Sequence, residues 1–254
     1  MSRTVVVTGG AKGIGRAVVQ RFAALGDQVV ALGRDRAALA QLELEAGVEV
    51  EVAQPVRTIA CDVTDERAVR AAFAQLDEVD VLVNNAGFGE SASLAKTTLE
   101  SWARHFDVNV SGPFLCMRAV VPGMRARRRG SIITVASTAA RVGTPYTSAY
   151  TASKHAAVGL TRAVASELAG SGVRVNAVCP TFVRTELTAR AIARIVELTG
   201  RSEADSGAAL TRSSPLGRLL EPDEVAEAIV FLASPAAATI NGQALVIDGG
   251  GIQA

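Results

Sequence analysis

A tyrosine and a lysine four residues apart, Tyr150 and Lys154, form the pair in this chain best suited to acid–base chemistry. They open a pattern that predicts a helix over residues 150–169, and this separation places both side chains on one helix face. Tyrosine, with an ordinary pKa of about 10, is a poor base near neutral pH, but a neighbouring ammonium group stabilises the phenolate and lowers that pKa. We therefore expect Tyr150 to donate a proton during reduction and to accept one during oxidation. The alternative is that the pair only lines a helix surface.

Two more polar residues lie where they can join this pair. Ser137 follows a strand predicted over residues 131–135, at the carboxyl edge where α/β sheets bind ligands, and its hydroxyl can stabilise negative charge on a substrate oxygen. Alternatively, this serine belongs to an ordinary turn. Asn109 falls inside a long helix predicted over residues 101–125. There its amide either holds a water that links Lys154 to solvent, or caps a break in the helix.

A glycine-rich turn, residues 8–15, separates the first predicted strand from the first predicted helix. Glycines let the backbone turn sharply and approach a pyrophosphate, which the N–H groups and the dipole of the following helix attract. The spacing, T-G-x-x-x-G-x-G, departs from the G-x-G-x-x-G fingerprint of dinucleotide-binding folds. Because of its place between a buried strand and a helix, we predict that the turn binds the phosphates of a dinucleotide through Gly9, Lys12, Gly13, Ile14 and Gly15.

The end of the second predicted strand, residues 29–32, bears on which nicotinamide cofactor is used. An acidic residue at this place hydrogen-bonds a free ribose 2′-hydroxyl and repels a 2′-phosphate. Gly33 occupies the place here, Arg34 follows it, and Lys12 lies in the glycine-rich turn on the same side. Two cations converging near the ribose favour NADP(H) over NAD(H). The alternative is that Arg34 faces solvent and that Asp35, one residue later, is the acidic residue.

Short β-branched runs alternate along the chain with longer helical patterns. Such alternation forces right-handed crossovers and a parallel sheet covered by helices on both faces. We therefore predict an α/β fold with one doubly wound (Rossmann) parallel sheet, as a single dinucleotide-binding catalytic domain over residues 1–254. The least regular stretch, residues 184–215, is expected to be a substrate lid, and Pro113 is expected to bend the long helix. The remaining predicted strands are 4–7, 58–60, 79–83, 173–178 and 244–247, and the remaining helices are 16–25, 37–45, 65–76 and 224–233.

The composition argues against several other classes of protein. Of 254 residues, 26 are Lys or Arg and 25 are Asp or Glu, and a net charge of +1 gives no electrostatic footprint for nucleic acid or a membrane surface. No apolar run is long enough to span a bilayer, and the start of the chain lacks a secretory leader. Three scattered cysteines favour a reducing compartment, and neither they nor the two histidines offer metal-ligand spacing. We therefore expect a cytoplasmic protein without a metal site, in which His105 and His155 are structural or surface residues.

Taken together, these residues resemble the pattern of the short-chain dehydrogenase/reductase family. The resemblance covers residues 4–250, with each motif in the family's order and approximate spacing. It implies a Rossmann fold with a seven-stranded parallel sheet, and a catalytic tetrad of Asn109, Ser137, Tyr150 and Lys154. Within the family, segments 150–155 and 175–180 are similar to those of 3-oxoacyl-thioester reductases and polyketide ketoreductases. The other motifs that carry the resemblance are residues 8–15, 62–63, 84–87 and 180–185.

The resemblance also implies a set of cofactor contacts. Asp62 and Val63 would contact the adenine, Asn85 the ribose, and Val183 with Thr185 the nicotinamide carboxamide. The loop after the sixth predicted strand has threonine where the family often has glycine, so that loop is expected to have a different shape. The implied cofactor-binding set is Gly9, Lys12, Gly13, Ile14, Gly15, Arg34, Asp62, Val63, Asn85, Ala86, Gly87, Tyr150, Lys154, Pro180, Val183 and Thr185.

These observations favour an enzyme over a binding protein. Our leading hypothesis is an NADP(H)-dependent reductase of a ketone such as a 3-oxoacyl thioester or a polyketide β-carbonyl, because the Ala-, Arg- and Leu-rich stretch 184–215 suits a phosphopantetheine or CoA arm. The alternative is an NAD-dependent dehydrogenase of a secondary alcohol or hydroxyacyl-CoA. A catalytically silent nucleotide-binding sensor is disfavoured because all four tetrad residues are present. The resemblance further implies a homotetramer through the helices at 101–125 and 150–169.

Overall fold

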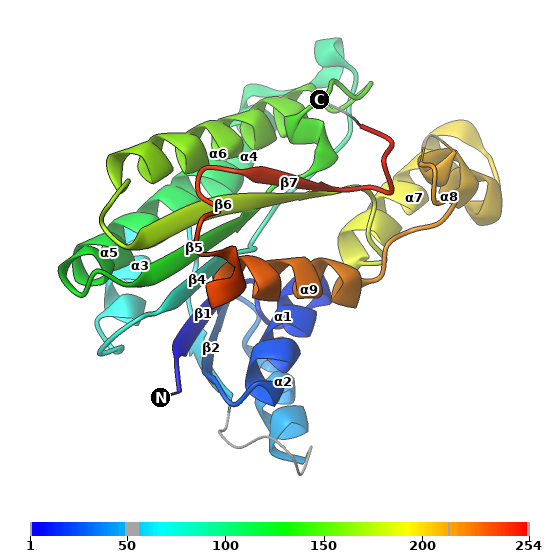
Figure 1. Cartoon of the computed structure of the whole chain (residues 1–254). Coiled ribbons are helices and arrows are strands. Elements are labelled where there is room, and N and C mark those ends of the chain that lie inside the picture. Colours follow the sequence, from blue (N-terminus) through cyan, green and yellow to red (C-terminus); the bar gives the residue numbers. More distant parts are fainter. Residues whose placement is uncertain (1, 49–55, 213, 253–254) are drawn as a thin grey trace.

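The computed structural model describes residues 2–48, 56–212 and 214–252, which fold around one seven-stranded parallel sheet (Figure 1). The strands lie in the order β3-β2-β1-β4-β5-β6-β7, and helices cover both faces. This confirms the predicted α/β fold with a doubly wound Rossmann sheet, and each predicted strand is present to within two residues at either end. The strands are β1 Thr4–Thr8, β2 Gln28–Gly33, β3 Arg57–Ala60, β4 Val81–Asn84, β5 Gly130–Val135, β6 Val173–Pro180 and β7 Ala244–Ile247.

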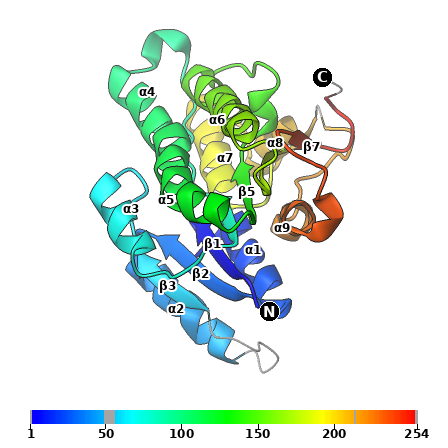
Figure 2. The ribbon, with the colours of Figure 1, turned by 60° about the vertical axis from the view of Figure 1, so that its left-hand side comes forward.

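Helices form two layers, one on each face of the sheet (Figure 2). In the part of the chain that the structure describes, no helix is both long and apolar enough to cross a membrane. The helices are α1 Gly13–Ala24, α2 Arg36–Val48, α3 Glu66–Phe73, α4 Leu99–Phe106, α5 Gly112–Ala126, α6 Ser148–Glu167, α7 Glu186–Thr199, α8 Glu203–Thr211 and α9 Pro222–Ala233, with the short turns η1 Leu94–Lys96, η2 Asp107–Ser111, η3 Thr138–Ala140 and η4 Pro235–Ala237.

The strands are apolar throughout because the sheet is buried on both faces. Along β1, Val5 and Val7 pack in the core with α1, α2 and α9, whereas Val6 packs in the opposite core with α3, α5 and α6. All three valines are fully buried. Successive side chains of a strand point to opposite faces, so one short apolar run contributes to both cores.

The order of the strands brings the sequence motifs to one edge of the sheet. β1 pairs with β2 on one side and with β4 on the other, and the direction in which the chain winds reverses at this point. Ligands of open α/β sheets bind outside the carboxyl ends of the strands at such a switch point. The loops after β1, β4, β5 and β6 all leave the sheet at these carboxyl ends.

The helix predicted over residues 101–125 is present as α4 and α5, which are joined by a π-helical turn that ends two residues before Pro113, where a bend was expected. A π-helical turn, η2, separates α4 from α5, and single π turns inside helices are often found at functional sites. Pro113 lies in the first turn of α5, and the residues before it are already helical, so its missing N–H removes one donor from the run of helical hydrogen bonds. The π turn, which contains Asn109, thus lies directly before the proline.

The stretch 184–215 is not irregular, contrary to the sequence-based expectation, because it contains α7 and α8. The side chains of Thr185 and Ser202 cap the two helices by accepting hydrogen bonds from Thr188 N and Asp205 N. Gly200, with φ of +68°, ends α7 in the left-handed conformation, which glycine adopts without strain. The caps were present in the sequence, but the two glycines and the mixed polar residues obscured them.

Candidate active site

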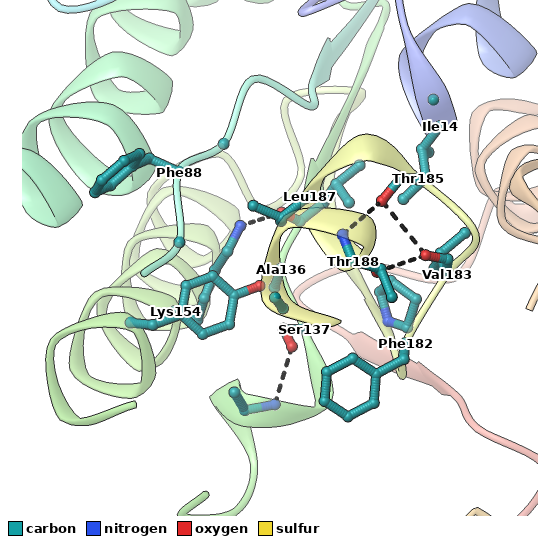
Figure 3. Close-up of a pocket in the computed structure, with 18 of the residues that line it drawn as sticks. Ile14, Phe88, Ala136, Ser137, Lys154, Phe182, Val183, Thr185, Leu187 and Thr188 are labelled. Carbon is teal, nitrogen blue, oxygen red and sulfur yellow. Dashed lines mark hydrogen bonds between the residues drawn. The ribbon is translucent and has the colours of Figure 1, made fainter. Parts of the chain in front are cut away.

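A cavity of about 370 Å³ opens at the carboxyl ends of the strands (Figure 3). The loops after β1, β4, β5 and β6 contribute to its wall, together with α6 and the first two turns of α7. Among the predicted site residues, those that line this cavity are Gly9, Lys12, Gly13, Ile14, Asn85, Ala86, Gly87, Ser137, Tyr150, Lys154, Pro180, Val183 and Thr185. Those that do not line it are Gly15, Arg34, Asp62, Val63 and Asn109.

Lys154 is a buried cation at the floor of this cavity. Its side chain belongs to α6, one turn after Tyr150, and the residue is only 5% exposed. The ammonium group donates a hydrogen bond to the backbone oxygen of Val135, at 2.9 Å, and lies 5.7 Å from the centre of the Tyr150 ring. Burial lowers the pKa of Lys154 from 10.5 to about 8, because a charged group loses its hydration in such a place.

The pKa of Tyr150 is raised above its ordinary value, which contradicts the predicted lowering by Lys154. Burial of the phenol is the main cause, and a hydrogen bond with the Ser137 side chain lowers the pKa by less. The Lys154 ammonium group does not offset burial, because it points to Val135 and remains several ångströms from the ring. In the chain by itself, the neutral phenol is therefore the stable form near neutral pH.

Ser137 lies directly after β5, as the sequence predicted, and it forms the expected turn, whereas its role toward a substrate oxygen stays a prediction. Its hydroxyl accepts a hydrogen bond from Ala139 N at 3.1 Å and begins the turn η3, so it does form a Ser-Thr turn. The same side chain also interacts with the phenol of Tyr150 and lines the cavity. In Figure 3 the hydroxyl of Ser137, which follows β5, and the ammonium group of Lys154, from α6, each form a hydrogen bond with the backbone.

Asn109 lies beside the cavity and not on its wall. Its amide clamps the backbone of Phe88, accepting from Phe88 N and donating to Phe88 O, each at 2.9 Å. The amide also donates to Ser153 Oγ at 2.9 Å. A Cβ built on Gly87 would lie 3.7 Å from both Asn109 Oδ1 and Lys154 Nζ, so Asn109 and Lys154 flank the same glycine. Asn109 thus lies in the helix break and holds the loop after β4; its role as a water relay stays a prediction.

The glycine-rich turn leaves an open cradle in which an added side chain has no room. Gly9 and Gly13 have φ of +64° and +51°, a conformation that only glycine adopts readily. A Cβ on Gly15 would lie 2.1 Å from the backbone oxygen of Gly9, which explains why this buried glycine is required although it does not line the cavity. α1 begins at Gly13, so the N–H groups of its first turn are placed as in sites that bind phosphate. The cradle therefore fits a dinucleotide.

Of the two cations expected near the ribose, Lys12 lines the cavity and Arg34 does not. Lys12 forms ion pairs with Asp35, at 3.0 Å, and with Glu186, at 3.5 Å. Arg34 has a side chain 64% exposed and lies 3.6 Å from Asp62. The alternative given by the sequence, a solvent-facing Arg34 followed by an acidic residue, is therefore close to what is observed. Asp35 is held at this place because its carboxylate also caps α2, where it accepts a hydrogen bond from Ala38 N.

The residues with predicted adenine contacts are engaged elsewhere in the fold. The Asp62 carboxylate accepts hydrogen bonds from the N–H and hydroxyl of Thr64, at 2.9 and 2.8 Å. Val63 is buried beneath Gly112, where an added Cβ would lie 2.9 Å from the valine side chain. Asn85 lines the cavity, but its amide donates to the backbone oxygens of Thr8 and Gly9. It thereby ties the loop after β4 to the glycine-rich turn.

Most residues of the cavity wall opposite the glycine-rich turn were not predicted from the sequence. That wall comes from the loop after β4, from the segment before α6, and from one face of α7. A helical pattern in 184–215 would have revealed the last part, since residues 187, 190 and 191 follow the spacing of one helix face. The missed residues that matter below are Phe88, Glu90, Thr144, Thr147, Phe182, Leu187, Arg190 and Ala191.

A dinucleotide cradle facing a tyrosine, a lysine and a serine defines a nicotinamide-dependent oxidoreductase, and comparison with known proteins agrees. The family profile described as Enoyl-(Acyl carrier protein) reductase matches residues 9–251. The chain belongs to the short-chain dehydrogenase/reductase family, whose members bind NAD(P) and act on secondary alcohols and ketones.

Three similar proteins illustrate the range of the family. D-threitol dehydrogenase of Mycolicibacterium smegmatis is 39% identical, over 98% of this chain and 92% of its own length. Granaticin polyketide synthase putative ketoacyl reductase 1 of Streptomyces violaceoruber is 38% identical, over 96% of this chain and 91% of its own. Among solved structures, a single-residue variant of actinorhodin polyketide ketoreductase with NADPH is 34% identical and superposes with a TM-score of 0.92, covering 98% of this chain and 97% of its own.

Proposed function

We propose that this chain reduces a ketone to a secondary alcohol with NADP(H). The observation that carries the proposal is that Ser137, Tyr150 and Lys154 meet in the same cavity as the glycine-rich turn. When bound, NADPH supplies a hydride to the carbonyl carbon. Tyr150 gives its phenolic proton to the carbonyl oxygen, and the Ser137 hydroxyl hydrogen-bonds that oxygen as negative charge develops on it. The phenol of Tyr150 is neutral in the chain by itself, because burial raises its pKa, so it holds the proton that reduction consumes.

Some observations favour NADP(H) as the cofactor, and one favours NAD(H). Gly33 at the end of β2 brings no carboxylate to the ribose, Lys12 lies in the cavity wall, and the similar actinorhodin ketoreductase was solved with NADPH. Against it, Asp35 stands beside Lys12 at 3.0 Å. We assign NADP(H) because the doubly charged 2′-phosphate offers Lys12 a stronger partner than the exposed carboxylates of Asp35 and Glu186 do. Titration of the protein with NADPH and NADH tests the assignment, and tighter binding of NADH would overturn it.

The substrate side of the cavity suits a 3-oxoacyl thioester or a polyketide β-carbonyl. Phe88, Phe182 and Leu187 make this side apolar, and Arg190 adds a cation from the same face of α7 as Leu187. Among the described residues, Arg190 has no hydrogen-bond or ion-pair partner, so it is available to the phosphate of a phosphopantetheine or CoA arm. Both ketoreductases described above act in polyketide synthesis by name.

A second candidate is the oxidation of a secondary alcohol with NAD. The name of D-threitol dehydrogenase shows that a protein of equal similarity acts on a polyol, and the polar residues Thr144 and Thr147 line the cavity. A panel of acetoacetyl-CoA, ethyl 3-oxobutanoate and cyclohexanone with NADPH, against polyols with NAD, distinguishes the two. Turnover of polyols alone would favour the dehydrogenase.

Two further features belong to the same proposal. Helices α7 and α8, which lie within the stretch 184–215, form a substrate lid, since α7 lines the cavity and the pair projects from the body of the fold (Figure 1). The chain also assembles as a homotetramer through α4, α5 and α6. Exposed Leu99, Trp102 and Phe114 on α4 and α5 support such an interface. Light scattering measures the assembly, and a monomeric mass would refute it.

The substitution Tyr150→Phe tests the chemistry directly. It removes the proton donor and leaves the ring, so turnover should fall at least about a hundredfold, the range of general acid catalysis. Binding of NADPH, followed by its fluorescence, should change little. The chain contains one other tyrosine, Tyr146, which is 70% exposed, so Tyr146→Phe is the matched control. A Tyr150→Phe enzyme that retains the wild-type rate would show that another group supplies the proton.

A further inference from the structure

His105 is a buried histidine with both ring nitrogens occupied, and the reaction scheme above gives it no part. It lies near the end of α4 and is 1% exposed. Its Nε2 accepts a hydrogen bond from the backbone N–H of Glu90 at 3.1 Å. A nitrogen that accepts carries no proton, so the proton of the neutral ring is on Nδ1. Nδ1 lies 2.7 Å from the backbone oxygen of Ser101 and donates to it.

These contacts close into a ring of three hydrogen bonds between α4 and the loop after β4. Glu90 donates its N–H to His105, and His105 donates to the backbone oxygen of Ser101. The hydroxyl of Ser101 in turn donates to Glu90 Oε2 at 3.1 Å. Glu90 is therefore fixed to α4 by its backbone and by its side chain together.

The segment that α4 holds in this way lies directly against the proposed acid. Phe88 is clamped by Asn109 and packs against the His105 ring, with 4.7 Å between ring centres. A Cβ on Gly89 would lie 3.1 Å from Cδ2 of Tyr150, so the backbone of Gly89 is in contact with that ring. The edge of the His105 ring also faces Tyr150, at 6.3 Å between centres and 73° between planes.

We propose that His105 is a positioning residue for the reaction. It fixes the backbone of Glu90 and thereby presses residues 88–90 onto the ring of Tyr150, so that the phenol is held toward Ser137. Asn109 anchors one end of this segment and His105 anchors the other. Without the second anchor the Glu90 N–H loses its acceptor, and Gly89, which has no side chain, cannot hold the segment in place. The proposal rests on Tyr150 as the acid of the reaction.

Two substitutions separate this role from simple packing. His105→Asn can still reach Ser101 O but not Glu90 N, because its side chain is too short; His105→Gln places an acceptor where Nε2 lies. With the fastest ketone of the panel, we expect kcat to fall about tenfold for His105→Asn, as for the loss of one buried hydrogen bond. His105→Gln should restore kcat to within about twofold. The affinity for NADPH should be unchanged in both, since the glycine-rich turn is not touched.

The tautomer of His105 gives a test that needs no variant to fold. The chain has two histidines, so nitrogen NMR of the wild-type protein, with His155→Gln for assignment, resolves both rings. We expect protonated Nδ1 and bare Nε2 at His105, and the opposite tautomer would overturn the proposal. It would also be overturned if both variants kept the wild-type kcat, or if His105→Gln lost as much activity as His105→Asn. Activity retained by Tyr150→Phe would instead refute the proposed function, whatever the His105 variants do.

Discussion

Replacement of Lys154 by methionine should make the protein more stable while removing its activity. The side chain is 5% exposed, and among the described residues its ammonium group has one hydrogen-bond acceptor, Val135 O, at 2.9 Å. Burying a charge with so little compensation is costly. Methionine has nearly the same length and no charge, so it fills the same space without that cost.

The size and the pH dependence of the effect follow from the pKa of Lys154. The pKa is about 8 in the folded chain against 10.5 for the ordinary group, and at 1.36 kcal/mol per pKa unit the buried charge costs about 3 kcal/mol near pH 7. Loss of the hydrogen bond to Val135 returns about 1 kcal/mol, which leaves a net gain of about 2 kcal/mol for the variant. Between pH 8 and 10.5 the unfolded state binds more protons than the folded state, so the wild type gains stability as pH rises. By about pH 9.5 the two proteins should therefore be nearly equal in stability.

Urea unfolding of the cofactor-free proteins at about pH 7 and about pH 9.5 measures this difference. Lys96→Met is the matched control, because Lys96 is exposed, and surface substitutions of this kind change stability by less than about 0.5 kcal/mol. A Lys154→Met protein less stable than the wild type at neutral pH would refute the reasoning. So would a stability gap that stays constant between the two pH values, because the cost would then not come from the charge.

Two predictions concern the remaining charges of the cavity. Asp35→Asn keeps the cap of α2 but removes the carboxylate that lies 3.0 Å from Lys12. The variant should bind NADPH about threefold to fivefold more tightly, the contribution of one exposed charge pair, and should bind NADH no more tightly. Equal changes in affinity for both cofactors in a fluorescence titration would contradict this prediction. Arg190→Ala should raise KM about fivefold for acetoacetyl-CoA and leave KM for the neutral ethyl 3-oxobutanoate unchanged. An equal rise in KM for both substrates would contradict the proposed contact between Arg190 and an anionic arm.

The fold could be predicted from the sequence because its strands are short apolar runs, which can be buried only in a sheet covered on both faces. Val5 to Val7 show this: three consecutive valines pack into two different cores, which only a sheet covered on both faces provides. The helices were harder to predict where propensity and packing disagree. Pro113 indicated a bend, and the chain has a π turn directly before it, a form that the sequence did not predict. Within that turn, Asn109 contacts Phe88 and Ser153, which are distant in the sequence, and a local pattern does not contain such contacts.

The site was predictable to the extent that its residues follow strand ends directly. Gly9, Ser137 and Pro180 lie at or just after the carboxyl ends of β1, β5 and β6, so the topology alone brings them together. Charge pairing was not predictable in this way. Lys12 and Arg34 were expected to face a phosphate, but each has a carboxylate as neighbour, and ion pairs between distant segments depend on side-chain positions that a linear pattern does not contain.

The burial of Tyr150 and Lys154 affects the charge of both groups, and these charges bear on the direction of the reaction. Burial raises the pKa of Tyr150 and lowers that of Lys154, so both groups move toward their neutral forms. A neutral phenol is a competent acid and a poor base, whereas oxidation of an alcohol requires the phenolate. Within the proposed function, an added positive charge is therefore needed for oxidation but not for reduction, and the oxidised nicotinamide ring is the group that would bring it. Reduction should accordingly proceed at lower pH than oxidation, and a pH–rate profile measured in both directions with one ketone–alcohol pair would fail to support this argument if the two optima coincided.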